Sequence, residues 1–124
     1  MRWVWKEHGD EIEFVVLFGS RARGDALEDS DYDILIGLAS EDGRRFVDRL
    51  GVFQDTETGK CDAFAYAPSE LAEMERDDNL LLLEALADGK PLFDRGAWTA
   101  MRQRFQGRLA GRTLARTSLG WDIR

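Results

Sequence analysis

Three segments of the chain have the pattern of β-strands. Residues 12–18 form a β-branched and aromatic run that ends at Gly19, and residues 34–38 form a second apolar run. A third strand is expected from Lys60 to Tyr66, after a loop rich in Asp, Thr and Gly. Short apolar runs bounded by turn residues are typical of strands covered on both faces. We therefore expect a small sheet in the centre of the protein.

Apolar residues at three- and four-residue intervals predict helices between these strands. Residues 42–50 form a short amphipathic segment with Phe46, Val47 and Leu50 on one face. Ser20, directly after the first strand, is a residue type that commonly caps the start of a helix. The first two strands are thus each followed by a predicted helix.

The second half of the chain is predicted to be mainly helical. Pro68 opens a helix that breaks near residues 77–79, and a second helix over residues 80–88 stops at Gly89. Proline at a helix start and glycine at a helix end match the usual preferences of these positions. Residues 97–116 are predicted to form a last helix because apolar side chains recur there at helical spacing.

The order of these elements predicts the fold class. Strand, short helix, strand, helix, strand and then further helices indicate an α/β or α+β protein, in which helices flank a small mixed sheet. The 124 residues are the usual size of one domain. Within that single domain we distinguish residues 1–96 from an arginine-rich segment, residues 97–124.

The composition is that of a water-soluble globular chain. Hydrophobic residues make up 44% and charged residues 33% of it, so the chain can bury a core and is too apolar for disorder. It has no apolar run of membrane-spanning length, and its first residues lack the apolar core of a signal peptide, so we expect a cytoplasmic protein. The single cysteine, Cys61, excludes a disulfide or a multi-cysteine metal site within this chain.

Charge is distributed unevenly along the chain. The net charge is −7, which argues against general affinity for nucleic acid phosphates. Residues 1–96 hold 11 basic and 23 acidic side chains, whereas residues 97–124 hold six arginines and one aspartate. Four of these arginines recur at every fourth position: Arg104, Arg108, Arg112 and Arg116. On a helix they would line one face, either as a solvated surface or as a contact with an acidic partner, RNA or a second copy.

Asp31 and Asp33 are the candidate metal ligands. They are separated by one residue at the start of the second strand, so both side chains point to one face, roughly 6.6 Å apart along the strand. Two such carboxylates can flank one divalent ion or bridge a pair of ions. Hard oxygen ligands suit Mg²⁺, which takes phosphate oxygens as further ligands. The implied substrate is a metal-bound polyphosphate.

A glycine-serine turn precedes this aspartate pair. Gly19 and Ser20 lie between the first strand and its helix, where backbone amides, a hydroxyl and the helix end suit phosphate oxygens. Arg21 and Arg23 add positive charge beside the turn. These four residues are the predicted nucleotide-binding set.

Together these residues resemble a known signature. Gly19-Ser20, followed after ten residues by Asp31-Tyr32-Asp33, is similar to the pattern of the polymerase-beta nucleotidyltransferase superfamily. The flanking residues 17–24 and 30–36 look most like its minimal nucleotidyltransferase family, and the likeness extends over residues 12–94. The resemblance implies a polymerase-beta-like nucleotidyltransferase fold and transfer of AMP from ATP bound to Mg²⁺, with two ions expected.

The resemblance also implies a third carboxylate and a partner protein. In that family a carboxylate on a later strand lies beside the pair, and Asp62 occupies the corresponding place. It can complete the metal site and accept the proton of an attacking hydroxyl. Members are often antitoxins that adenylylate a tyrosine of a HEPN-domain ribonuclease toxin. They usually carry a longer helix before the first strand, so here either that helix is short or the chain starts upstream.

Several other interpretations of these residues compete with this one. Asp31 and Asp33 alone could be turn residues. Gly19 and Gly24 have the glycine spacing of a Walker A loop, but residues 25 and 26 are Asp-Ala rather than the lysine and hydroxyl residue, which excludes that loop. The acceptor could instead be a small hydroxylated molecule such as an aminoglycoside. A binding module that neutralises its partner without turnover is the other alternative. In each case the chain could form a homo- or hetero-oligomer.

Overall fold

The protein is built around a four-stranded mixed sheet. The structure, a computed structural model, describes residues 8–24, 31–54, 59–118 and 120–123. β1 pairs antiparallel with β2 and β4, and β2 pairs parallel with β3, in the order β3-β2-β1-β4. The four strands are β1 (Ile12–Phe18), β2 (Tyr32–Leu38), β3 (Cys61–Tyr66) and β4 (Lys90–Asp94). The predicted mixed sheet is confirmed, although β2 begins earlier than the sequence predicts.

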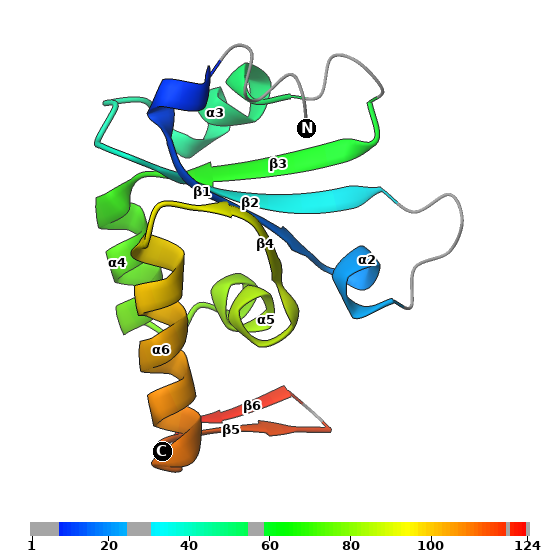
Figure 1. Ribbon diagram of the computed structural model, residues 1–124, viewed down its shortest axis with the longest axis vertical. Helices are drawn as coiled ribbons and strands as arrows, with labels where there is room; N and C mark the ends of the chain where they lie inside the picture. The colour runs from blue at the N-terminus through cyan, green and yellow to red at the C-terminus, as the bar shows by residue number, and fades with distance from the viewer. Residues whose placement is uncertain (1–7, 25–30, 55–58, 119, 124) are drawn as a thin grey trace.

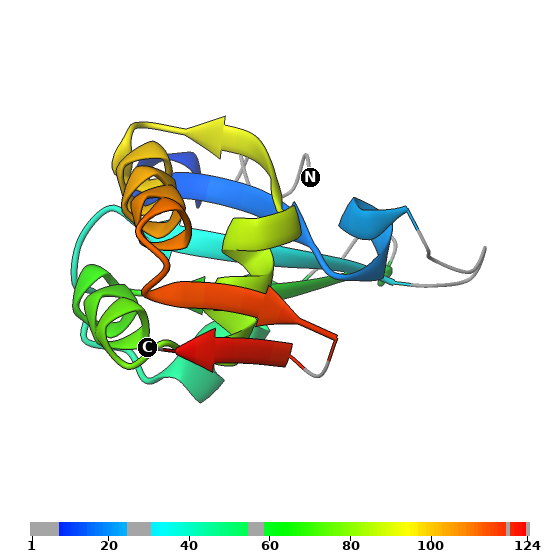
Figure 2. The same cartoon turned by 90° about the horizontal axis from the view of Figure 1, so that it is seen from below.

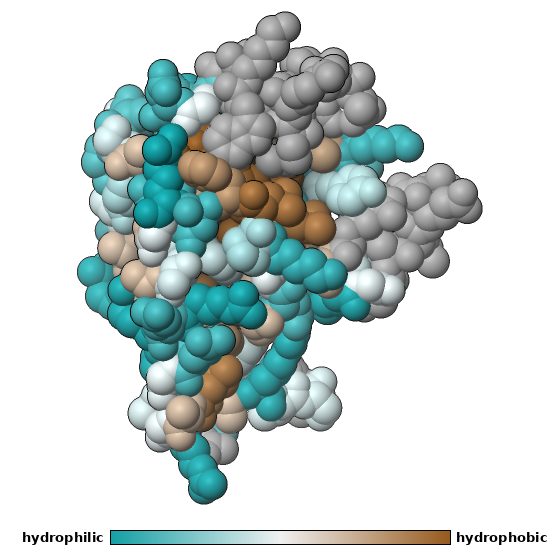
Figure 3. Space-filling view, viewed as in Figure 1, coloured by the Kyte–Doolittle hydropathy of each residue, from teal (hydrophilic) through white to brown (hydrophobic). Residues whose placement is uncertain are grey.

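Helices cover both faces of this sheet (Figure 1). The 3₁₀ helix η1 (Gly9–Glu11) and α3 (Phe46–Val52) lie on one face, while α4 (Pro68–Arg76), α5 (Leu80–Asp88) and α6 (Ala97–Ala110) form a layer on the other. The short helix α2 (Ser20–Arg23) follows β1 at one end of the sheet. The visible surface of the layer formed by α4, α5 and α6 is mostly hydrophilic (Figure 3). None of the described helices is long and apolar enough to cross a bilayer.

The strands bury side chains on both faces, which explains their continuous apolar runs. Phe14 and Leu35 join the cluster beneath α5 and α6, whereas Val15 and Ile34 join the cluster on the side of α3. The Phe14 ring contacts Trp98 of α6, with the ring centroids 5.3 Å apart. Each fully buried side chain of this size contributes roughly 1.5–3 kcal/mol through removal of apolar surface from water. The two clusters therefore hold helices against both faces of one sheet.

The predicted break between two helices in the second half is confirmed. The Asn79 side-chain oxygen accepts a hydrogen bond from the Leu82 amide at 3.2 Å, which caps the start of α5. Gly89 ends α5, and a Cβ atom there would lie 2.2 Å from the Ala85 carbonyl oxygen. Only glycine permits this close approach, so the chain can turn directly from α5 into β4.

The short helix α3 differs from its prediction in position and in orientation. It spans residues 46–52 rather than 42–50, and Val47 and Leu50 are 59% and 41% exposed. The buried side chain is Arg49, which is only 2% exposed. Its guanidinium bonds Asp42 at 3.0 Å and Glu70 at 2.5 Å. This pairing allows a charged residue to take the inward position that periodicity assigns to an apolar one.

The predicted helix over residues 97–116 is wrong in its second half. α6 ends at Ala110, and Arg112 adopts a left-handed backbone conformation with φ of 61°. The chain then forms a hairpin of β5 (Leu114–Thr117) and β6 (Gly120–Ile123). The hairpin lies below α5 in Figure 1 and in front of it in Figure 2, which is seen from below. A turn at Gly111 and Arg112 therefore overrides the helical spacing, because a left-handed residue cannot continue a right-handed helix.

The four regularly spaced arginines consequently do not share one helical face. Arg112 lies in the turn and Arg116 in β5. Three of the four pair with acidic side chains of α4 and α5 or the turn between them: Arg104 with Glu75 at 2.7 Å, Arg108 with Asp78, and Arg116 with Glu84 at 2.6 Å and Asp88 at 2.8 Å. The acidic surface that these side chains contact therefore belongs to their own chain.

Candidate active site

The turn after β1 brings backbone close to an aspartate of β2. Gly19 joins β1 to α2 with φ of 76°, a conformation that L residues rarely adopt. A Cβ atom at this position would lie 2.5 Å from Oδ2 of Asp33. The N-cap of α2 is Gly19 and Ser20 is the first residue of the helix, so Ser20 does not occupy the predicted capping position. The turn thus places glycine backbone, without a side chain, against the Asp33 carboxylate.

The structure places the three predicted aspartates at the same end of the sheet. Asp31 immediately precedes β2, and Asp33 is the second residue of that strand. Asp62 is in register with Asp33 on the parallel neighbour β3. Neighbouring strands are about 4.8 Å apart, and residues in register point to the same face. Asp33 and Asp62 therefore project side by side on the face that carries Leu35, at the end reached by the Gly19 turn.

The electrostatic environment of Asp33 is dominated by other acids. Burial raises the pKa of the Asp33 carboxyl, and the negative charges of Asp62 and then Asp31 raise it further. Arg23 of α2 acts in the opposite direction. Among the described residues, no side chain forms an ion pair with any of the three aspartates. The charged neighbours of Asp33 are thus mainly acidic, and negative charge is concentrated at this end of the sheet.

A divalent cation fits this donor chemistry only with help from its substrate. Within the described ranges, no group of three or more His, Cys, Asp or Glu side chains is gathered closely enough to hold a metal ion. Mg²⁺ requires few protein carboxylates, since it retains waters and takes phosphate oxygens as ligands. Asp33 with one neighbour matches that requirement. The three-carboxylate metal site remains a prediction.

The structure describes the side chain of only one of the two arginines near the turn. Arg23 is exposed on α2 and acts electrostatically on both Asp33 and Asp88. The side chain of Arg21 lies outside the described part of the chain. Sequence analysis did not single out Asp88, the last residue of α5, because nothing in the local sequence shows that the fold brings it near Arg23.

Comparisons with known sequences match most of the chain. Residues 4–97 match the family described as Polymerase beta, Nucleotidyltransferase. A candidate protein adenylyltransferase of Methanocaldococcus jannaschii is 42% identical over 50 residues, which are 40% of this chain and 33% of that protein. The match thus spans a third of that relative's length. The family match includes all three aspartates and ends at the beginning of α6.

Comparisons with solved structures agree on the fold. A candidate nucleotidyltransferase from Sulfolobus solfataricus is 25% identical, with a TM-score of 0.53 over 77% of this chain and 75% of that chain. A toxin-antitoxin structure with AMP-PNP is 17% identical, with a TM-score of 0.54 over 90% and 89% of the two chains. A mutant of the toxin-antitoxin pair MntA-HpeT is 15% identical, with a TM-score of 0.51 over 90% and 89%. The predicted fold is confirmed.

Proposed function

Because the chain belongs to the polymerase beta nucleotidyltransferase family, we propose that it transfers AMP from Mg²⁺-bound ATP to a hydroxyl group of a partner protein. The observation that carries this proposal is the approach of the Gly19 backbone to Asp33, with Asp62 in register beside it. Phosphates and carboxylates can share a cation only where both reach the same place. The end of β1 and the start of β2 meet that condition.

Each predicted site residue has a distinct role in this reaction. Gly19 and Ser20 would bind the polyphosphate through backbone amides and the hydroxyl, with Arg21 and Arg23 neutralising its charge. Asp31, Asp33 and Asp62 would hold Mg²⁺, as one ion or two. Bound Mg²⁺ supplies positive charge to the phosphate oxygens. This charge would act against both causes that raise the Asp33 pKa, first its burial and then its repulsion by Asp62 and Asp31.

The chemical step is a single displacement at phosphorus. The acceptor oxygen forms a bond to the α-phosphorus of ATP while the bond from that phosphorus to the bridging oxygen breaks. Pyrophosphate leaves with the electron pair, and the acceptor proton passes to the Asp62 carboxylate. Asp62 suits this role because it is exposed at the start of β3, next to Asp33. An incoming hydroxyl could therefore reach it from solvent.

A protein is the favoured acceptor. The Methanocaldococcus jannaschii relative, named as a candidate protein adenylyltransferase, supports this choice. The toxin-antitoxin structures of the same fold suggest a toxin as the partner, and a tyrosine of a HEPN-domain toxin is the acceptor we favour. The chain would then act as an antitoxin that inactivates its partner by adenylylation.

Transfer of labelled AMP tests the proposal directly. The protein is incubated with α-labelled ATP, Mg²⁺ and the product of the neighbouring gene, with an aminoglycoside in a parallel reaction. Asp31→Asn and Asp33→Asn remove the candidate ligands. Asp48→Asn is the matched control, because Asp48 lies on α3 and pairs with Arg45 at 3.1 Å, away from the site.

Three outcomes separate the alternatives. Label on the partner protein with the wild-type chain and Asp48→Asn, but not with the other two variants, supports the proposal. Label on the aminoglycoside instead identifies a small-molecule transferase. Neutralisation of the partner by all variants without label transfer identifies a binding module and contradicts the enzymatic proposal.

A further inference from the structure

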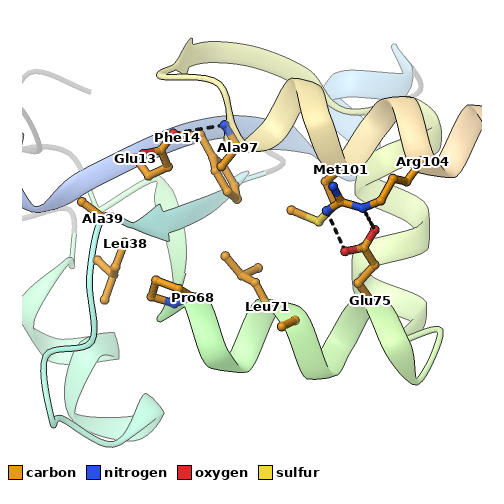
Figure 4. A pocket seen from close by; sticks show the side chains of 11 residues that line it. Glu13, Phe14, Leu38, Ala39, Pro68, Leu71, Glu75, Ala97, Met101 and Arg104 are labelled. Atoms are coloured by element: carbon orange, nitrogen blue, oxygen red, sulfur yellow. Dashed lines mark hydrogen bonds and ion pairs between the residues drawn. The ribbon is translucent and has the colours of Figure 1, made fainter.

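A hollow lies at the other end of the sheet from the aspartates. This crevice, which we call the α4-α6 crevice, has a volume of about 290 Å³ and lies between α4 and α6 (Figure 4). Leu38 and Ala39, at the end of β2, line it. Asp33 lies near the start of that strand, so roughly 17 Å of strand separates the crevice from the candidate active site. The crevice is therefore separate from the catalytic machinery.

The interior of the crevice is apolar and preformed. Four apolar side chains from four elements line it: Phe14 of β1, Leu38 of β2, Leu71 of α4 and Met101 of α6. All four are buried within the protein, so they are already packed. Figure 4 shows Leu71 and Met101 projecting into the space between the two helices. The flexible side chain of Met101 can adapt its shape to different contacting groups, which suits a site that binds a side chain of another protein.

Charged groups occupy the rim of the same crevice. Glu13 accepts a hydrogen bond from the Ala97 amide at 3.1 Å through one carboxylate oxygen. No described residue donates to its other oxygen. On the other side, Arg104 donates two hydrogen bonds to Glu75, at 2.7 and 2.8 Å (Figure 4). Because Arg104 and Glu75 neutralise each other, Glu13 is the uncompensated charge.

The size and charge of the crevice together define its occupant. Sites for drug-sized ligands span about 300–1,000 Å³, so this crevice fits one or two side chains better than a nucleotide. We propose that it receives an apolar side chain from a basic segment of the acceptor protein. The apolar side chain would contact Leu71 and Met101, and a neighbouring lysine or arginine would pair with Glu13. This inference rests on the proposed function only in taking the acceptor as the partner.

A second copy of the chain is a less suitable occupant. Arg104, Arg108 and Arg116 of each copy are already paired with acids of their own helices. A second copy could not present these three arginines to Glu13 without breaking their pairs, whereas a different protein would have no such cost. Anchoring the acceptor away from the aspartates would also raise its effective concentration at the active site.

Blocking the crevice tests the apolar contact. Ala72 is an exposed lining residue on α4, so Ala72→Trp adds bulk there without replacing a core side chain. The control is Gln103→Trp, which adds the same ring at an exposed position of α6 that does not line the crevice. Binding of the product of the neighbouring gene is measured by calorimetry with the full chain. Ala72→Trp should weaken it by about tenfold or more, as for loss of a central anchor, and Gln103→Trp should not.

Two rim variants test the charge of the occupant. Glu13→Gln keeps an acceptor for the Ala97 amide but removes the negative charge, so it should weaken binding by about threefold. Arg104→Gln frees Glu75, so it should tighten binding by a similar factor. Weaker binding by Glu13→Gln together with tighter binding by Arg104→Gln is expected only for a basic partner. The reverse pair of signs would overturn the proposal, because it would indicate an acidic partner.

The binding and transfer measurements separate this inference from the proposed function. Unchanged partner affinity of folded Ala72→Trp would overturn the crevice proposal even if AMP transfer proceeds. Weaker binding by Ala72→Trp would support it even if the chain transfers no AMP, which would overturn the enzymatic proposal alone. A dimer of the wild-type chain that Ala72→Trp dissociates, seen by sedimentation, would assign the crevice to a second copy and overturn the proposal.

Discussion

Two groups of acidic side chains, near opposite ends of β2, differ in how their charge is compensated. At the start of the strand, Asp33 lies beside Asp62, and the structure describes no ion pair to either. Beyond its end, Asp42 and Glu70 pair with the buried Arg49. Accordingly, burial and neighbouring acids raise the pKa of Asp33. The pKa of Asp42 is lowered instead, mainly by hydrogen bonds from Arg49 and to a smaller extent by those from Arg44, although partial desolvation opposes this shift.

This difference separates binding from stability. Compensated carboxylates favour the folded state, because separation of the charges in a partly buried site costs free energy. Uncompensated carboxylates oppose folding slightly and gain most when a cation arrives. The start of β2 is thus suited to bind a cation and the end of β2 to hold elements together. Substitutions at the start of β2 should therefore reduce activity without reducing stability. Substitutions in the group beyond its end should reduce stability.

The largest expected effect is loss of catalysis on neutralising Asp33. Asp33→Asn should lower the rate of AMP transfer by about a thousandfold, the order found when a group that stabilises transition-state charge is removed. Its melting temperature should be unchanged or higher, since repulsion with Asp62 and Asp31 is relieved. Label transfer and thermal unfolding, measured on the same sample, test both parts. A fall in the melting temperature would contradict the comparison.

The second effect is loss of stability on removing Arg49. Arg49→Met should lower the free energy of unfolding by about 3 kcal/mol, because Asp42 and Glu70 lose their buried partner. Urea unfolding measures this change. The triple variant with Asp42→Asn and Glu70→Gln should recover part of the loss. A single variant as stable as the wild type would show that the network does not stabilise the fold.

A smaller effect is expected for the turn glycine. Gly19→Ala combines an unfavourable φ with a Cβ atom 2.5 Å from Oδ2 of Asp33, so AMP transfer should fall by about thirtyfold and stability by about 1 kcal/mol. Gly24→Ala is the matched control, since φ is 80° there and no atom lies within 4 Å of the added Cβ. It should cost similar stability but leave transfer intact. Equal losses of transfer would attribute the effect to backbone strain alone.

The smallest effect concerns a half-buried, compensated carboxylate, Asp88. Hydrogen bonds from Arg116 lower the pKa of Asp88 despite its partial burial. A lowered folded-state pKa gives stability that is present above the unfolded value, near 3.8, and is lost as pH falls through the folded value. The melting temperature of the wild type should therefore fall more steeply than that of Asp88→Asn between about pH 5 and about pH 3. At neutral pH the variants should differ by under about 0.5 kcal/mol, because Arg116 is 42% exposed. Parallel curves would contradict the prediction.

The sequence predicted those parts of the fold that local patterns determine. β1 matches its predicted range because it buries side chains on both faces, which requires apolar residues at nearly every position from 12 to 18. The break before α5 was predictable from Asn79 and nearby turn residues. The position of Asp31 and Asp33 at the start of the second strand was also predictable, because the apolar run that marks this strand follows them directly. The register of Asp62 beside Asp33 came from family resemblance, since pairing of distant strands has no local signal.

Sequence patterns failed where distant residues decide the local structure. Arg49 takes the buried position of α3 because Asp42 and Glu70 compensate it, and no spacing rule for apolar residues includes such pairing. The segment after Ala110 continues the four-residue arginine spacing, yet Leu114 is buried as the start of a hairpin. Arg116 pairs with Glu84 and Asp88 from β5 rather than from a helix. Tertiary contacts therefore determined both departures.

The central position of β1 has a consequence for the motions of the candidate active site. Hydrogen-bonded on both sides, to β2 and β4, and with Phe14, Val15 and Val16 fully buried, this strand should have the amides that exchange slowest with deuterated water. α2, a single short helix attached to its end through Gly19, should exchange by local opening instead. Nucleotide binding should slow exchange in α2 and leave β1 unaffected. The phosphate-binding turn would thus join a rigid strand, β1, to a short helix, α2, that can adjust to the nucleotide.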